Sequence, residues 1–133
     1  MTRTGKNASY VLDASALLCL LFREPGGEAV EALMAGARIS AVNLSEVIAK
    51  LIDRGAPGGM VVSDLAELDL EVVAVDRRQA ELAGLMREKT RTQGLSLGDR
   101  ACLALAAHVG ATAVTADRAW ASVDVGVALE IVR

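Results

Sequence analysis

The stretch YVLDASALLCLLF, residues 10–22, decides the fold class because it joins a short apolar strand to an apolar helix. Residues 10–12 predict a buried strand, and the residues after it predict a helix that Ser15 can cap. Asp13 is the only charged residue in the stretch. A buried carboxylate costs several kcal/mol unless it is paired, hydrated or bound to a metal ion. The position of Asp13 therefore needs a specific explanation.

Strand and helix patterns alternate along the rest of the chain. Further strands are predicted at residues 38–42, 71–75, 111–115 and 128–132, and helices near 27–35, 43–54, 58–68, 77–90 and 96–109. Short, continuously apolar strands between helices are typical of a parallel sheet covered on both faces. The predicted fold is therefore α/β: one domain over residues 10–133, with a central parallel sheet of about five strands flanked by helices on both faces. Residues 1–9 are predicted to be a disordered leader.

Composition and charge limit the possible functions. The chain has 133 residues, of which 53% are hydrophobic, so it can bury a full core. Its net charge of −3 argues against tight non-specific binding of nucleic acid, but it does not exclude an RNA substrate. No apolar run reaches the ~18 residues of a membrane span, and the polar N-terminus lacks the apolar core of a signal peptide. We expect a cytoplasmic protein without a membrane contact.

Four acidic residues are predicted near one edge of the sheet. Asp13 follows the first strand, Glu46 lies one turn beyond the second, and Asp117 follows the fourth. Ligands of open parallel sheets bind beyond the carboxyl ends of the strands. Asp99 lies in the first turn of the helix that leads into the fourth strand, so it joins the other three if that helix begins at this edge.

Helix capping is the alternative role for each of these acids. Two pairs have the spacing of a capping box: Asn43 with Glu46, and Ser96 with Asp99. Asp13 and Asp117 also stand where N-caps occur. Asp76 follows a predicted strand in the same way, and there a cap is the preferred interpretation.

Taken together, the four carboxylates favour a metal site. At separations of roughly 6 Å and an effective dielectric constant near 20, each pair of like charges costs about 3 kcal/mol. The six pairs together cost roughly 15 kcal/mol or more, which is comparable with the stability of a whole domain. Such a cluster must take up protons or cations, and all-oxygen ligands suit Mg²⁺ or Mn²⁺ better than zinc. A site of this kind without a protein nucleophile indicates metal-assisted hydrolysis of a phosphodiester.

Four segments carry a resemblance to a known family. In order they are LDASALL (12–18), NLSEVIAKL (43–51), SLGDRACLALA (96–106) and VTADRAW (114–120). Their order and spacing resemble PIN-domain ribonucleases, and above all the VapC-type toxins of bacterial type II toxin–antitoxin systems. The resemblance implies a Mg²⁺- or Mn²⁺-dependent endoribonuclease acting on tRNA or rRNA. It identifies Asp13, Glu46, Asp99 and Asp117 as metal-binding and catalytic acids.

The resemblance also implies supporting residues and partners. Ser15, Asn43 and Thr115 match polar positions beside the acids, although each can equally serve its own helix or strand end. The chain is expected to form a homodimer and to bind a cognate VapB-type antitoxin. Some PIN domains carry a further acid two residues beyond the position of Asp117, and here that residue is Ala119. A five-acid arrangement, and with it full occupancy of a second metal site, is therefore in doubt.

A group of basic residues surrounds the loop before Asp99. Its members are Arg87, Lys89, Arg91 and Arg100. They are either a solvated helix end with favourable charges or a guide for the RNA backbone. In the second case, Arg91→Ala weakens RNA cleavage more than it weakens metal binding.

Three other functions compete with the ribonuclease. A phospho-acceptor receiver domain needs adjacent acids after the first strand and a late lysine, but Ala14 and Ser15 follow Asp13 and no lysine follows Lys89. A haloacid-dehalogenase-like phosphatase needs a second acid where Ser15 stands. A catalytically silent PIN module that acts as a scaffold or RNA-binding subunit also fits the fold, but it does not need all four acids.

Overall fold

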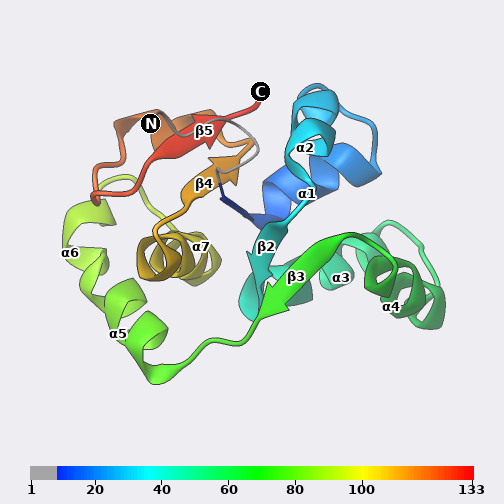
Figure 1. Cartoon of the computed structure of the whole chain (residues 1–133), viewed down its shortest axis with the longest axis horizontal. Helices are drawn as coiled ribbons and strands as arrows, with labels where there is room; N and C mark the ends of the chain where they lie inside the picture. Colours follow the sequence, from blue (N-terminus) through cyan, green and yellow to red (C-terminus); the bar gives the residue numbers. More distant parts are fainter. Residues whose placement is uncertain (1–8) are drawn as a thin grey trace.

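A five-stranded, entirely parallel sheet runs through the computed structural model, which describes residues 9–133 (Figure 1). The strands are β1 (Tyr10–Leu12), β2 (Ala37–Ser40), β3 (Leu70–Val73), β4 (Thr112–Thr115) and β5 (Leu129–Ile131). Their order across the sheet is β3-β2-β1-β4-β5. The predicted α/β fold is confirmed. The predicted leader, residues 1–9, lies outside the described residues except for Ser9.

Helices cover both faces of this sheet (Figure 1). They are α1 (Ala14–Leu21), α2 (Gly27–Leu33), α3 (Ala41–Asp53), α4 (Gly58–Ala66), α5 (Arg77–Leu85), α6 (Arg87–Thr90) and α7 (Leu97–Val109), with the 3₁₀ turn η1 (Arg118–Ser122) before β5. Helices α1 to α4 gather on one side and α5 to α7 on the other. Among the described residues, no helix combines the length and apolar character needed to cross a bilayer.

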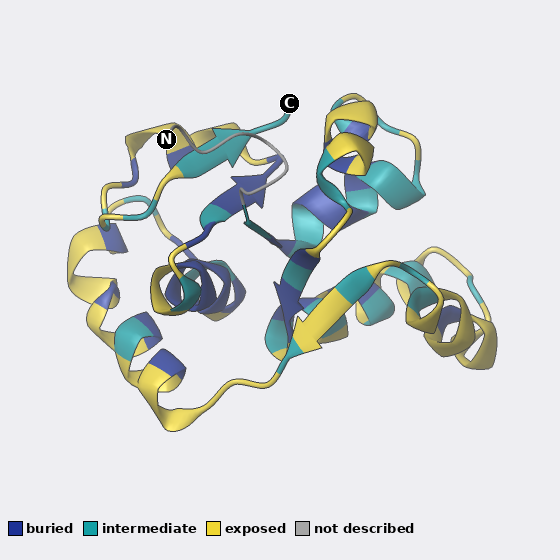
Figure 2. Cartoon of the chain, in the orientation of Figure 1, coloured by how far each residue is buried: buried dark blue, intermediate teal, exposed yellow. Residues whose placement is uncertain are grey.

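The alternating side chains of β1 and β4 build a core on each face of the sheet. Val11 and Ala113 pack with α7 and Trp120, whereas Leu12 and Val114 face the side of α1 and α3. All five of these side chains are fully buried. Figure 2 shows burial concentrated in these central strands and in α7, while α4 to α6 and the edge strand β3 are mostly exposed.

Strand order reverses between β1 and β4, and this reversal places the site. The chain runs outward from β1 through β2 to β3, and it then returns to add β4 and β5 on the other side. The backbone N–H of Asp13 donates to the carbonyl oxygen of Val114 at 3.0 Å, so the ends of β1 and β4 are held together. In doubly wound sheets the crevice at such a point is where ligands bind.

Two predicted helix starts are wrong. Of the two residues predicted as possible caps of α1, Asp13 is the N-cap and Ser15 is not: Asp13 Oδ1 accepts from the N–H of Ala16 at 2.8 Å. Helix α3 begins at Ala41 and not at Asn43, because the Ser40 side chain already caps this helix. Ser40 both ends β2 and caps α3, so strand and helix follow each other without a loop.

Other predicted boundaries shift by a few residues, and one helix divides. The helix predicted at 77–90 is two helices, α5 and α6, which meet at Met86. Asp76 caps α5 through a hydrogen bond from the N–H of Gln79 at 2.9 Å, as predicted. Gly110 ends α7 with φ of 69°, a left-handed conformation that glycine adopts easily.

Candidate active site

A pocket of about 240 Å³ lies at the carboxyl ends of β1 and β4, and all four predicted acids line it. The lining residues are Asp13, Ala14, Ser15, Leu18, Glu46, Lys50, Asp99 and Asp117. Asp99 joins the others because α7 begins beside α3, where a side chain of α3 bonds to the backbone of α7. A larger cavity of about 830 Å³ lies against the loop between α1 and α2, but none of the four acids lines it.

The strand corner of the pocket consists of Asp13, Ser15 and Thr115. Asp13 Oδ1 accepts from Ser15 Oγ at 2.7 Å, and Asp13 Oδ2 accepts from Thr115 Oγ1 at 2.6 Å. Thr115 Oγ1 in turn accepts from the N–H of Asp117 at 3.0 Å. With the capping bond from Ala16, both oxygens of Asp13 have partners. The corner is therefore a closed network that fixes the orientation of one buried carboxylate.

Burial changes the acidity of Asp13. Its side chain is only 3% exposed, and this burial raises its pKa from the usual 3.8 to about 6. The hydrogen bonds from Thr115, Ala16 and Ser15 oppose the rise, and the charge of Asp99 adds to it. Without a cation, Asp13 therefore holds a proton up to nearly neutral pH. A bound divalent cation favours the ionised form.

The helix corner of the pocket consists of Asn43, Glu46 and Gly98. Asn43 lies inside α3 and is 1% exposed; its Nδ2 donates to Glu46 Oε1 at 2.8 Å and to the carbonyl oxygen of Gly98 at 3.0 Å. The predicted Asn43–Glu46 capping box is therefore wrong. The carboxylate of Glu46 occupies the space that a Cβ at position 98 would fill. Glycine at this position lets α7 approach α3 closely enough for Glu46 to reach the pocket.

Asn43 also leaves one polar atom unused. Its Oδ1 is buried and has no hydrogen-bond partner among residues 9–133. Rotating the amide by 180° would place this oxygen against the Glu46 carboxylate and the Gly98 carbonyl, so the two Nδ2 contacts fix the orientation. A buried acceptor without a hydrogen-bond partner is costly.

Asp99 and Asp117 cap helices and line the pocket at the same time. Asp99 Oδ2 accepts from the N–H of Ser96 at 2.9 Å, which completes the predicted capping box of α7. Asp117 Oδ1 accepts from the N–H of Ala119 at 2.9 Å and caps η1. Each has a second carboxylate oxygen with no donor among the described residues. Capping and a role at the pocket are therefore compatible for both acids.

These residues suit a hard divalent cation. The donor set that lines the pocket is made of carboxylate oxygens, which fits a hard divalent cation such as Mg²⁺ or Mn²⁺. Within residues 9–133, however, no three His, Cys, Asp or Glu side chains stand close enough to enclose one ion. Mg²⁺ usually keeps several waters and is bound through one or two carboxylates plus substrate phosphates, so a Mg²⁺ site does not require three such side chains.

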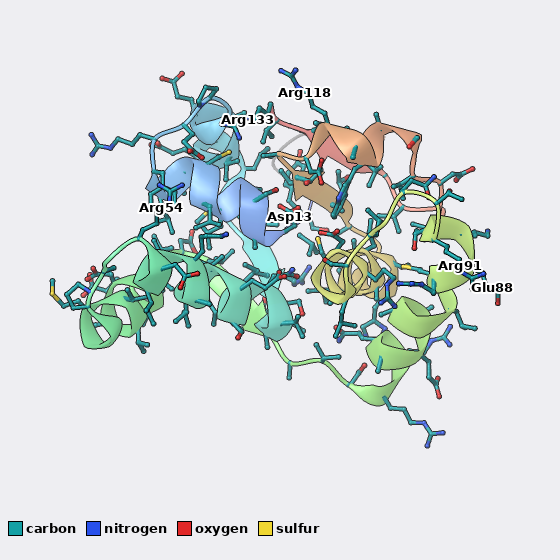
Figure 3. The ribbon with its side chains drawn as sticks, turned by 180° about the vertical axis from the view of Figure 1, so that it is seen from behind. Asp13, Arg54, Glu88, Arg91, Arg118 and Arg133 are labelled. Atoms are coloured by element: carbon teal, nitrogen blue, oxygen red, sulfur yellow. The ribbon has the colours of Figure 1, made fainter. Side chains whose placement is uncertain are left out.

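The predicted basic guide lies elsewhere. Arg87, Lys89 and Arg91 are exposed and line no part of the pocket. Figure 3 shows Asp13 in the middle of the molecule and Arg91 at its edge, beyond α7. Arg100 Nη1 donates to the carbonyl oxygen of Ala83 at 3.0 Å and so ties α7 to α5. Their contact with RNA stays a prediction.

Lys50 is a charged residue of the pocket that was not predicted from the sequence. It lies on α3 and lines the pocket together with the four acids. The available signal was spacing, because Lys50 follows Glu46 by four residues and such residues share one face of a helix.

The sequence matches one family model, that of the PIN domain, over residues 10–126. The chain belongs to the PIN domain family. This confirms the family that the four sequence segments predicted. No protein among the curated sequences matches the chain.

Solved structures share the fold of this PIN domain over nearly its whole length. DNA-bound VapBC from Salmonella typhimurium matches with a TM-score of 0.72 at 18% identity, covering 95% of this chain and 99% of that chain. VapBC-5 of the VapBC toxin–antitoxin family, from Mycobacterium tuberculosis, matches at 0.61 with 25% identity, covering 95% and 98%. VapC20 from the same organism, a toxin that cleaves the sarcin–ricin loop, matches at 0.68 with 16% identity, covering 86% and 96%.

Proposed function

We propose that this PIN domain is a divalent-metal-dependent endoribonuclease that hydrolyses phosphodiester bonds of tRNA or rRNA. One observation carries the proposal: Asp13, Glu46, Asp99 and Asp117 come from separate parts of the chain and line one pocket at the point where strand order reverses. The similarity to a toxin that cleaves the sarcin–ricin loop supports RNA as the substrate class.

The four acids would hold Mg²⁺ or Mn²⁺, which when bound lowers the pKa of a water and offsets the charge of the leaving oxygen. The protein's part is to orient the carboxylates. Ser15 and Thr115 hold Asp13, and Asn43 holds Glu46.

Ser15 is an orienting residue in this scheme and not a nucleophile. Its Oγ donates to Asp13 and accepts from the N–H of Ala116 at 2.9 Å. No histidine among the described residues lines the pocket to pair with this hydroxyl, and Asp13 and the backbone hold it in place. Attack by water on the phosphorus is therefore the reaction that this set of residues supports.

We further propose that the chain acts in the cytoplasm as a growth-inhibiting toxin. The similar structures include VapBC assemblies, two of them bound to DNA. By analogy, a VapB-type antitoxin would neutralise this chain, and the active form would be a homodimer. Growth arrest on expression, relieved by co-expression of a neighbouring antitoxin gene, is the expected result.

Cleavage of a mixed tRNA and rRNA pool tests the enzymatic proposal. Wild-type protein should cleave it with Mg²⁺ or Mn²⁺, and chelation of the metal should stop the reaction. Asp13→Asn and Asp99→Asn should each reduce cleavage to the level seen with the chelator. Asp76→Asn is the matched control, because Asp76 also caps a helix but lies outside the pocket. Cleavage that survives chelation or both pocket substitutions contradicts the proposal.

A further inference from the structure

Lys50 is the single basic residue among those that line the acidic pocket in the described part of the chain. Its side chain is exposed, and it lies on α3 one helical turn beyond Glu46. No carboxylate of residues 9–133 lies within 4.0 Å of its ammonium nitrogen. The pocket therefore presents four acids together with one cation that is not used in an ion pair.

The missing ion pair is informative because this spacing normally favours one. A glutamate four residues before a lysine on an exposed helix face is a stabilising pair. Here Asn43 holds Glu46 Oε1 at 2.8 Å and directs it toward α7, away from that pairing. If Lys50 served only the helix, its ammonium group would be expected on Glu46. It is instead left available at the pocket.

We propose that Lys50 binds a phosphate of the RNA backbone at this pocket, an inference that rests on the proposed ribonuclease function. A polyanionic strand that approaches four carboxylates is repelled until cations offset their charge. A lysine ammonium is a compact charge on a flexible stem and a common phosphate ligand. Lys50 thus supplies a fixed positive charge beside the acids, and it selects for a phosphate without selecting for a base.

The other basic residues are less suited to this task. Arg100 is hydrogen-bonded to α5, and Arg91 lies at the far edge of the molecule from Asp13 (Figure 3). Arg54 stacks over the ring of Phe22 at 4.4 Å from its centre. Lys50 is therefore the described cation best placed to contact a strand whose phosphate enters the pocket.

Steady-state cleavage kinetics of Lys50→Gln test the proposal. We expect KM for RNA to rise about tenfold with kcat nearly unchanged, because a charged hydrogen bond to bound substrate is lost. The slope of log KM against log salt concentration should fall by about 0.7, the value for one phosphate contact of a single strand. Lys50→Arg should restore most of the affinity. The affinity for Mn²⁺, measured by calorimetry without RNA, should be equal or higher in Lys50→Gln, since a positive charge has been removed.

Arg78→Gln is the control, because it removes one positive charge from the exposed surface of α5 outside the pocket. An unchanged KM and salt slope in Lys50→Gln, or equal changes in Arg78→Gln, overturn the proposal.

If the wild type cleaves no RNA, the ribonuclease function fails, and the role of Lys50 is then tested by RNA binding alone. In that case the Kd for a labelled single-stranded RNA of mixed sequence is measured by fluorescence anisotropy in the presence of Ca²⁺. Equal Kd values for wild type and Lys50→Gln overturn the phosphate-binding role; weaker binding by Lys50→Gln supports it.

Discussion

The strand corner and the helix corner hold their carboxylates by different means. In the strand corner, two hydroxyl groups and a backbone N–H satisfy both oxygens of Asp13, which is 3% exposed. In the helix corner, a single amide holds Glu46, which is itself exposed, and the amide keeps an unpaired oxygen. The first corner belongs to neighbouring strands, whereas the second depends on how closely α3 and α7 pack.

This difference separates two kinds of cost. The strand corner carries an electrostatic cost, because the buried carboxyl of Asp13 must ionise there to hold the proposed cation. The helix corner carries a steric condition, because Glu46 needs the space left by the missing side chain at Gly98. Changes at the strand corner should therefore alter stability and its pH dependence. Changes at the helix corner should alter the site with little effect on stability.

The largest expected effect is the pH dependence of stability that Asp13 causes. Its pKa is about 6 in the folded chain and 3.8 when unperturbed, so the folded state binds more protons between these values. Stability from this group is therefore fully present only below the unfolded pKa of 3.8, and it falls as pH rises through about 6, by roughly 3 kcal/mol in total. Urea unfolding from pH 4 to 7 without divalent cations measures it.

Asp13→Asn isolates this contribution. The amide oxygen can still cap α1, and the residue no longer titrates. The stability of the variant relative to wild type should rise by about 2.4 kcal/mol from pH 4 to pH 7. Added Mg²⁺ should reduce the difference, because the cation binds the ionised form of the wild type. Parallel pH profiles for the two proteins would contradict the buried-carboxyl account.

The next effect follows from removing one hydroxyl of the strand corner. Thr115→Val keeps the shape of the side chain but leaves Asp13 Oδ2 and the N–H of Asp117 without their partner. We expect a loss of about 2 kcal/mol in the free energy of unfolding. The pKa of Asp13 should rise further, since the Thr115 hydrogen bond lowers it. Thr112→Val, on the same strand, is the control, and an equal loss there would contradict the prediction.

The strand corner was largely predictable from the sequence. Apolar runs located the strands, and a parallel sheet places their carboxyl ends at one edge. Asp13 and Asp117 directly follow such runs, so predicting that the two side chains lie close together needed only the knowledge that β1 and β4 are neighbours. The capping roles of Asp76 and Asp99 followed from local spacing in the same way. Metal binding and catalysis by the four acids stay predictions.

The helix corner was less predictable because its geometry comes from packing. Ser40 and Asn43 both suit an N-cap, and only the structure shows that Ser40 takes that place and leaves Asn43 inside the helix. Asn43 reaches Gly98 across 55 positions of sequence, a contact that no local pattern encodes. The same limit applies to Arg100, for which the sequence left a helix-end role and an RNA contact open and gave no sign of its hydrogen bond to α5.

The smallest expected effect on stability, with a clear effect on the site, comes from Gly98→Ala. The new Cβ overlaps the Glu46 carboxylate, which is the flexible end of an exposed side chain and can move away. Alanine also favours the helix, so the free energy of unfolding should be unchanged or up to about 1 kcal/mol higher. Metal affinity and RNA cleavage should fall by about 10- to 100-fold, the usual range for disturbing the support of a metal ligand.

Gly84→Ala provides the matched control for this substitution. Gly84 lies in α5, and a Cβ there meets nothing within 4 Å. Both variants should therefore unfold at similar or higher urea concentrations than the wild type, while only Gly98→Ala loses metal affinity in a Mn²⁺ titration. If Gly98→Ala binds Mn²⁺ as tightly as the wild type, metal binding does not depend on the present position of the Glu46 carboxylate. A large loss of stability would show instead that the backbones of α3 and α7, and not the Glu46 side chain, give way to the new methyl group.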